Sequence, residues 1–139
     1  EEPAFDVYEA RSNAGLVGRV GSLPGETSLG DLAAAVASNL AGSPRISGDL
    51  DDVVRTVAVV PGSGGSLVAD AAATGAQLYL TGDMSHHQTV EARDRGLAVI
   101  DPGHAASERP GVAALLGAMS QLGITVVDLT VDPTPWRTP

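Results

Sequence analysis

Short apolar runs without polar alternation predict the strands of this chain. Four of them recur along the sequence, at residues 57–60 (VAVV), 78–80 (LYL), 97–100 (LAVI) and 124–127 (ITVV). Runs of this kind are typical of strands that are covered on both faces. A further strand is expected near residues 16–23, and a short edge strand near residues 45–47.

Segments of helical length separate these runs. The clearest follows Ser28, where residues 29–40 place leucine, alanine and valine on one face and Asp31 completes a capping box with Ser28. Three more helices are expected at residues 67–75, 87–96 and 110–123. Strands that alternate with helices predict an α/β fold, with a mainly parallel sheet and helices on both faces.

The start of the last helix is expected near residues 107–110, because proline favours the first helical turn and disfavours helical geometry in the residue before it. Pro110 would then open the helix and His104 would lie in the preceding loop. The proline-rich tail after residue 130 is expected to be an extended arm with Trp136 as its one large anchor.

Composition narrows the class of protein. The 139 residues, 43% of them hydrophobic and only 3% aromatic, suit a single domain with a core of small aliphatic side chains. The net charge of −9, with eight basic residues, argues against binding to nucleic acid. Without cysteine, any metal must be held by histidine and carboxylates. No apolar run is long enough to span a membrane, so a cytoplasmic protein is expected.

Three loops follow the predicted strands and should lie along one edge of the sheet, where parallel α/β folds bind their ligands. Their sequences are PGSGGS at residues 61–66, TGDMSHH at 81–87 and DPGHAASE at 101–108. All three histidines of the chain, His86, His87 and His104, fall in these loops. This clustering is the strongest physical indication of a functional site.

His104 and Glu108 offer a nitrogen and an oxygen ligand that suit zinc, manganese or iron. By itself the H-x-x-x-E spacing also fits two polar residues of an ordinary loop. For TGDMSHH the alternatives are a turn in which Asp83 caps a helix, or a cleft in which Asp83, His86 or His87 orient a substrate or transfer protons.

The glycine-rich loop admits two interpretations. Gly62, Ser63, Gly64 and Gly65 could let backbone amides approach a phosphate group at a helix N-terminus. The loop lacks the lysine of a P-loop and does not match G-x-G-x-x-G, so a tight strand-to-helix turn explains the glycines equally well.

Taken in order, several segments resemble one family. EEPAFDVYE, GLVGRVGSL, VAVVPGSGGSLVADAAATGAQLYLTGDMSHHQ and IDPGHAASERPGV are similar to the C-terminal half of the Nif-three-like proteins, also called dinuclear metal centre hexameric proteins. The resemblance covers nearly the whole chain. It implies that residues 1–139 are one lobe of a two-lobed α/β protein and that the N-terminal lobe is absent, so that the chain is a fragment.

The resemblance also implies a site and an assembly. The family binds two divalent metal ions, commonly zinc, iron or manganese, between its lobes, and its members form a hexameric ring. The G-H-x-x-x-E signature maps onto His104 and Glu108 as metal ligands. The family's His-His-Pro segment has no counterpart here, since His86 and His87 are followed by Gln88, so the site in this chain is expected to be incomplete.

Two functions follow from the resemblance as hypotheses. The first is a metal-dependent hydrolase, since members are called type-two GTP cyclohydrolase homologues; Asp83 and His87 would then support the metal or transfer protons, while residues 62–65 and His86 would bind a nucleotide or another phosphorylated small molecule. This chain alone is expected to be inactive. The second is a non-enzymatic, metal-dependent regulator or oligomeric scaffold.

Overall fold

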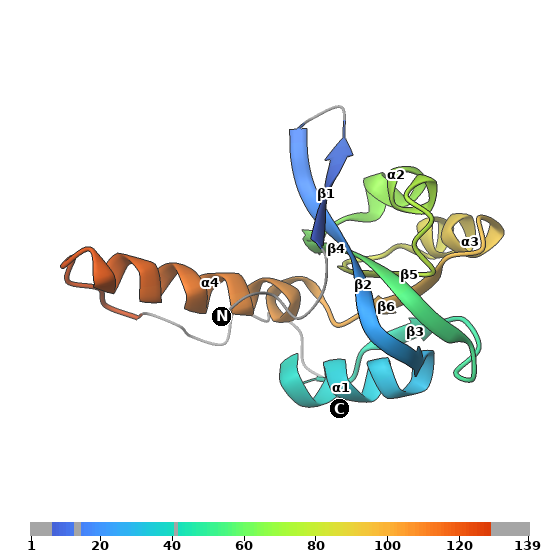
Figure 1. The fold of residues 1–139 in the computed structure, drawn as a ribbon, viewed down its shortest axis with the longest axis horizontal. Coiled ribbons are helices and arrows are strands. Elements are labelled where there is room, and N and C mark those ends of the chain that lie inside the picture. The colour runs from blue at the N-terminus through green and yellow to red at the C-terminus, as the bar shows by residue number, and fades with distance from the viewer. Residues whose placement is uncertain (1–6, 13–14, 41, 129–139) are drawn as a thin grey trace.

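The chain forms one mixed sheet with helices on both faces. The computed structural model describes residues 7–12, 15–40 and 42–128. Its strands are β1 (Val7–Ser12), β2 (Gly15–Ser28), β3 (Arg45–Ser47), β4 (Val53–Ser63), β5 (Leu78–Gly82) and β6 (Ala98–Asp101). Its helices are α1 (Leu29–Leu40), the short 3-10 turn η1 (Gly65–Leu67), α2 (Val68–Ala73), α3 (His86–Asp94) and α4 (His104–Gln121) (Figure 1).

The order of strands across the sheet is β1-β2-β4-β5-β6-β3. The three central strands β4, β5 and β6 run parallel, whereas β1, β2 and β3 pair antiparallel at the two sides. The α/β class is therefore confirmed, with the parallel pairing in the centre of the sheet. Because β4, β5 and β6 run parallel, the loops that follow them share one edge.

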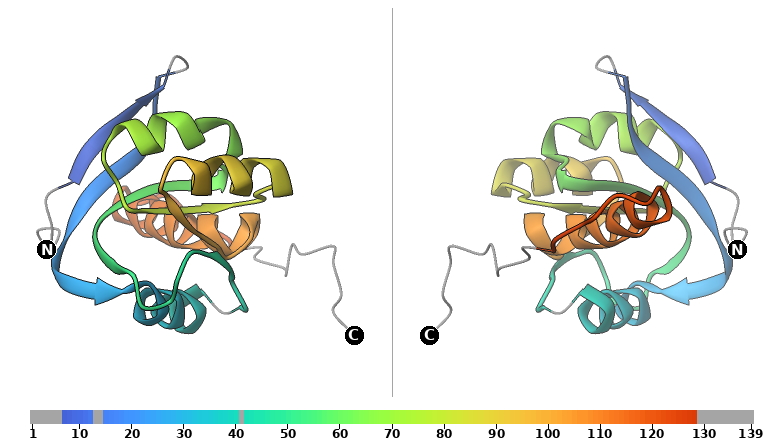
Figure 2. Two further views of the ribbon diagram at one scale, coloured as in Figure 1. Left: turned by 90° about the vertical axis from the view of Figure 1, so that its right-hand side faces the viewer. Right: turned by 90° about the vertical axis from the view of Figure 1, so that its left-hand side faces the viewer.

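Two hydrophobic clusters cover the two faces. Helices α2 and α3 contribute Val68, Ala71 and Ala92 to the cluster that includes Tyr79. Helix α1 contributes Leu29 and Ala33 to the cluster on the opposite face. Figure 2 shows α2 and α3 on one side of the sheet and α1 with α4 on the other. The prediction of helices on both faces is confirmed.

Most predicted elements lie where the pattern placed them. Strand β3 has the expected bounds, and Ser28 caps α1 by accepting a hydrogen bond from the amide of Asp31 at 3.0 Å. The prediction of a strand at residues 124–127 is wrong, because this segment has no regular structure. Ile124 and Val127 are exposed there, so no neighbouring strand among the described residues covers them. Trp136 lies outside the described residues.

Among the described helices, even the 18-residue α4 falls short of the combination of length and apolar character that a membrane span requires.

Candidate metal site at the strand ends

The three predicted loops meet at one edge of the sheet. The amide of Gly62, near the end of β4, donates a hydrogen bond to Oγ of Ser107 in α4 at 2.9 Å. A Cβ atom on Gly62 would lie 2.7 Å from Oε1 of Glu108 and 3.4 Å from Nε2 of His104. The backbone at Gly62 therefore lies directly against the two predicted ligands, and a larger residue would displace them.

Gly82 lies where the same three loops cross. A Cβ atom there would approach the carbonyl oxygen of Gly62, the carbonyl carbon of Gly103 and the amide nitrogen of His104, each to 2.7 Å. Real Cβ atoms do not come this close to backbone atoms, so only glycine allows the loops after β4, β5 and β6 to pack together. Gly82 thus helps to determine where His104 lies.

His104 is the first residue of α4, and Glu108 follows one turn later on the same face. Nε2 of His104 lies 3.4 Å from Oε1 of Glu108, and both side chains are about half exposed, at 48% and 50%. Two atoms that each lie about 2.1 Å from a tetrahedral zinc ion are separated by about 3.4 Å. The separation of the two side chains therefore fits two ligands of one metal ion.

The expected start of this helix is wrong. Helix α4 begins at His104, and Pro110 lies inside it. Proline removes one amide, the one that would bond the carbonyl of Ala106, while the amide of Ser107 still bonds the carbonyl of Gly103 at 3.1 Å. The first turn therefore forms before the proline, and the simple spacing of four residues on one helical face applies.

Asp83 contacts the other side of the His104 ring. Its Oδ2 lies 2.8 Å from Nδ1 of His104. When Nδ1 carries the proton and donates a hydrogen bond to this carboxylate, Nε2 keeps a lone pair on the side of Glu108. Asp83 adopts a positive φ of 54°, a conformation that aspartate tolerates better than most residues. Its carboxylate bonds His104. The N-cap of α3 is Ser85, not Asp83.

The same contact raises the pKa of His104. The hydrogen bond to Asp83 is the main cause, and the negative charges of Glu108 and Asp83 add to it, while desolvation of the ring opposes it. In the metal-free site the imidazole therefore keeps its proton to a higher pH than an ordinary histidine does. Since a metal ion binds only the neutral ring, protons compete with metal at this position.

Asp101, which the sequence analysis did not single out, holds the loops in place. It is 4% exposed and ends β6. Its Oδ2 accepts from the amide of Met84 at 2.9 Å and from Arg45, and its Oδ1 accepts from the amide of Gly103 at 2.8 Å. Met84 follows Asp83 in the chain, and Gly103 precedes His104. The Asp101 carboxylate therefore bonds the backbone next to both residues of the Asp83–His104 hydrogen bond. Its place after an apolar run was visible in the sequence, but its burial was not.

The glycine-rich loop is closely packed. The amide of Gly64 donates to Oγ1 of Thr81 at 2.9 Å, and its carbonyl accepts from the hydroxyl of Tyr79 at 2.8 Å. Burial raises the pKa of Tyr79 to about 12, which keeps this hydroxyl protonated. The amides of Gly62 and Gly64 are thus both occupied by side-chain oxygens, as in a tight strand-to-helix turn. Phosphate binding by residues 62–65 stays a prediction, with Gly65 buried and Ser63 exposed.

His86 and His87 open α3, and their rings contact each other edge to face with centroids 5.8 Å apart. Both are exposed. Among the described residues no hydrogen bond or ion pair joins either ring to His104, Glu108 or Asp83. The structure therefore brings Asp83 to the predicted ligands and leaves His87 apart from them, so its proton-transfer role remains a prediction.

Within the described part of the chain, no group of three or more histidine, aspartate or glutamate side chains is arranged to hold a metal ion. His104 and Glu108 form a pair, and the Asp83 carboxylate is bonded to the ring nitrogen on the far side. The described residues therefore offer two ligands side by side, and an incomplete site stays the prediction for this chain.

The fold and the site define an α/β protein whose candidate chemistry lies at the ends of its parallel strands. The family model Duf34/NIF3 (NGG1p interacting factor 3) matches residues 6–135. The chain belongs to this family, which confirms the resemblance seen in its motifs.

Similar proteins and solved structures support the same family. The chain is 40% identical over 123 residues to a protein of Nostoc called GTP cyclohydrolase 1 type 2 homolog, covering 86% of this chain and 47% of that protein. It is 35% identical to the Bacillus subtilis protein of the same name, covering 98% and 39%. A Bacillus cereus protein related to NIF3 matches with a TM-score of 0.70 and 34% identity, over 88% and 36% of the two chains. The chain thus spans less than half the length of these relatives.

Proposed function

We propose that His104 and Glu108 supply part of a dinuclear metal centre in a metal-dependent hydrolase, whose remaining ligands lie outside residues 1–139. The observation that carries the proposal is the bond of Nδ1 of His104 to Asp83, which leaves Nε2 to face Glu108 at 3.4 Å. A histidine held by a carboxylate on one nitrogen and open on the other is the usual arrangement of a metal ligand.

The residues fit a divalent ion of the zinc, iron or manganese type, two of which would occupy the complete site. One nitrogen and one carboxylate oxygen are ligands that these ions accept, and the chain has no thiolate that would select otherwise. Divalent ions bound there would act as Lewis acids in a hydrolytic reaction. The names of the relatives support a nucleotide such as GTP as substrate, and the family resemblance supports a ring of six subunits.

This chain's own residues have separate tasks in such a reaction. Asp83 fixes the orientation and tautomer of His104, and Asp101 holds the backbone on either side of that pair. The backbone at Gly62 limits the space beside Glu108. His87 stays a candidate for proton transfer, while His86 and residues 62–65 stay candidates for binding the substrate.

Metal binding is tested first, by calorimetric titration of the chain with Zn²⁺ and with Mn²⁺. His104→Ala and Glu108→Gln should each weaken binding by at least about tenfold, since each removes one ligand. Glu91→Gln is the matched control, because Glu91 is a half-exposed helical glutamate in an i,i+4 pair with Arg95, on a different helix. Equal binding by all four proteins would contradict the assignment of these ligands.

Turnover is tested next, on the longest natural form of the protein that contains this chain. With metal bound, it should hydrolyse GTP or another nucleotide, and His104→Ala should abolish the reaction while the circular dichroism spectrum is unchanged. Metal binding without turnover across a panel of nucleotides would reject the hydrolase and favour the alternative of a metal-dependent regulator or scaffold.

A further inference from the structure

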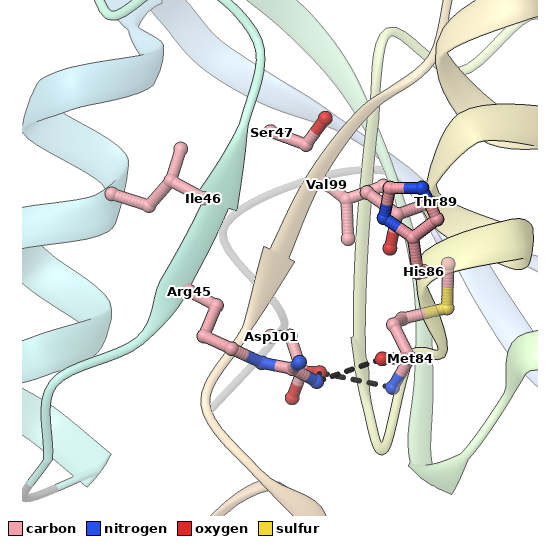
Figure 3. Close-up of a pocket in the computed structure, with 8 residues that line it drawn as sticks. All are labelled: Arg45, Ile46, Ser47, Met84, His86, Thr89, Val99 and Asp101. Carbon is pink, nitrogen blue, oxygen red and sulfur yellow. Dashed lines mark hydrogen bonds and ion pairs between the residues drawn. The ribbon is translucent and has the colours of Figure 1, made fainter.

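A pocket of about 250 Å³ lies between the edge strand β3 and helix α3, at the same edge of the sheet as the candidate metal site. The described residues that line it come from four segments: Arg45, Ile46 and Ser47 of β3, Met84 of the loop after β5, His86 and Thr89 of α3, and Val99 and Asp101 of β6. Figure 3 shows the Arg45 guanidinium beside Asp101 and Met84, with His86 and Thr89 on the opposite side.

Arg45 is the one basic residue among the described polar side chains that line the pocket. Its Nη2 donates to the carbonyl of Met84 at 2.8 Å and forms an ion pair with Asp101. Among the described residues, its Nε and Nη1 have no hydrogen-bond partner, and the side chain is 68% exposed. A guanidinium carries five N–H donors in a rigid plane, so the arginine is fixed by one nitrogen and keeps the other two for a ligand.

Two more polar side chains line the same space. Ser47 and Arg45 pair with Val99 and Asp101 across the antiparallel ladder, and their spacing of two sets them on the same face of the sheet. His86 approaches from the start of α3 (Figure 3). Within the described chain, the side chains of Ser47 and His86 make no hydrogen bond, so both are available as donors. The pocket therefore offers three donor side chains from two elements.

The one acid of the lining, Asp101, does not oppose an anion strongly. Its carboxylate is 4% exposed, and both oxygens already accept from backbone amides and Arg45. Ile46, Val99 and Met84 make up the apolar part of the lining, and Val99 and Met84 are buried. The hydroxyl of Thr89, the remaining polar group, donates to the carbonyl of Ser85. The net charge of −9 makes the chain as a whole repel anions. This pocket differs, because it gathers hydrogen-bond donors and its one carboxylate is already bonded.

We propose that this pocket binds the phosphate group of a small phosphorylated molecule, with Arg45 as the main phosphate contact and Ser47 and His86 as further donors. Arginine suits phosphate because its donors match the anionic oxygens. The pocket is larger than a phosphate ion, so the apolar base of Val99 and Met84 would contact the organic part of the molecule. The proposal extends the candidate substrate-binding role of His86 to a pocket with Arg45 and Ser47, and it does not depend on the metal centre.

The test uses the metal-free chain and amide NMR titrations, first with inorganic phosphate and then with guanosine monophosphate. Shifts should appear at residues of β3, at the start of α3 and at Asp101, and the nucleotide should bind more tightly than phosphate alone. Arg45→Gln should weaken both by at least about tenfold, since it removes a charged donor. Arg55→Gln is the matched control, because Arg55 also forms an exposed ion pair, with Glu26, on another strand.

Arg45→Gln also removes the partner of Asp101, so its fold is checked by circular dichroism. Ser47→Ala and His86→Ala leave the ion pair intact and should each weaken phosphate binding several-fold. Shifts centred on residues 62–65, equal weakening by Arg55→Gln, or no change in Ser47→Ala and His86→Ala would overturn the proposal. Binding of phosphate at the pocket without tighter binding of the nucleotide would overturn the part that concerns the organic group.

Discussion

Helices α1 and α4 lie on the same face of the sheet, yet they use their apolar sides differently. In α1, Leu29 is 0% exposed and packs with Ala33 against Val54 and Ile100. In α4, no residue is buried; Leu115 in its second half is 60% exposed, and Leu122, which follows the helix, is 77% exposed. Figure 1 shows α4 extending away from the sheet, whereas α1 runs beneath it. Similar apolar spacing thus gives one core helix and one helix that is anchored by its first turns.

The two helices are held in different places. The first turn of α4 is fixed at the strand ends, where Ser107 accepts from Gly62 and His104 contacts Asp83. Its later turns leave Val112 and Leu115 exposed. Helix α1 contributes to stability through burial, and α4 contributes the candidate ligands through the position of its N-terminus.

The largest difference in the free energy of unfolding should come from shortening one leucine side chain in each helix. Leu29→Ala should lower the free energy of unfolding by about 2 to 5 kcal/mol, because it leaves a cavity beside Val54 and Ile100. Leu115→Ala should change it by less than about 1 kcal/mol, because this side chain is mostly exposed. Urea unfolding followed by circular dichroism measures both.

The baseline for this pair is Ser38→Ala, at an exposed position of α1. This variant should leave the free energy of unfolding within about 0.5 kcal/mol of the unmodified chain, because the serine side chain occupies no part of the core. Comparable losses in Leu29→Ala and Leu115→Ala would mean that the apolar side of α4 is covered in solution, and the contrast between the helices would fail.

A smaller effect is expected where the start of α4 joins the neighbouring loops. Asp101→Asn should lower the free energy of unfolding by about 1 to 3 kcal/mol, because the amide group of asparagine cannot accept from Arg45, Met84 and Gly103 together. The amide resonances of Asp83 and His104 should shift in the same variant, since each is one residue from a lost contact. Urea unfolding and NMR measure the two effects.

Asp51→Asn is the control for this experiment, because Asp51 is an exposed acid in the loop before β4. If Asp101→Asn lowers stability but leaves the resonances of Asp83 and His104 unchanged, then Asp101 supports the core and does not position the pair.

Much of the fold could be predicted from the sequence, because buried parallel strands and amphipathic helices each have a periodicity of their own. Strands β4, β5 and β6 and helix α1 show this well. The segment 124–127 shows the limit: its apolar run satisfies the pattern of a strand, but a strand also needs a neighbour with free backbone groups, and the pattern does not contain that information.

The site was predictable in its side chains and less so in its geometry. His104, Glu108 and Asp83 were all candidates, because three loops at the ends of parallel strands had to share one edge. The start of α4 at His104 does not follow from the usual preference of proline for the first helical turn. Inside the helix, Pro110 removes only one backbone hydrogen bond. Asp101 was missed because a buried carboxylate and an exposed one look the same in a sequence.

The smallest effect, and the most specific to the start of α4, is on the titration of His104. Asp83→Asn should lower the pKa of His104 toward its ordinary value, because it removes the charge and the acceptor that favour the imidazolium. A raised pKa in the folded chain stabilises it fully below the ordinary histidine value, and this contribution is lost as the pH rises through the raised pKa. Ring resonances of His104 in the metal-free chain, followed against pH, measure the change; Asp94→Asn should leave the titration unaltered, and an unaltered titration in Asp83→Asn would show that Asp83 does not hold this ring.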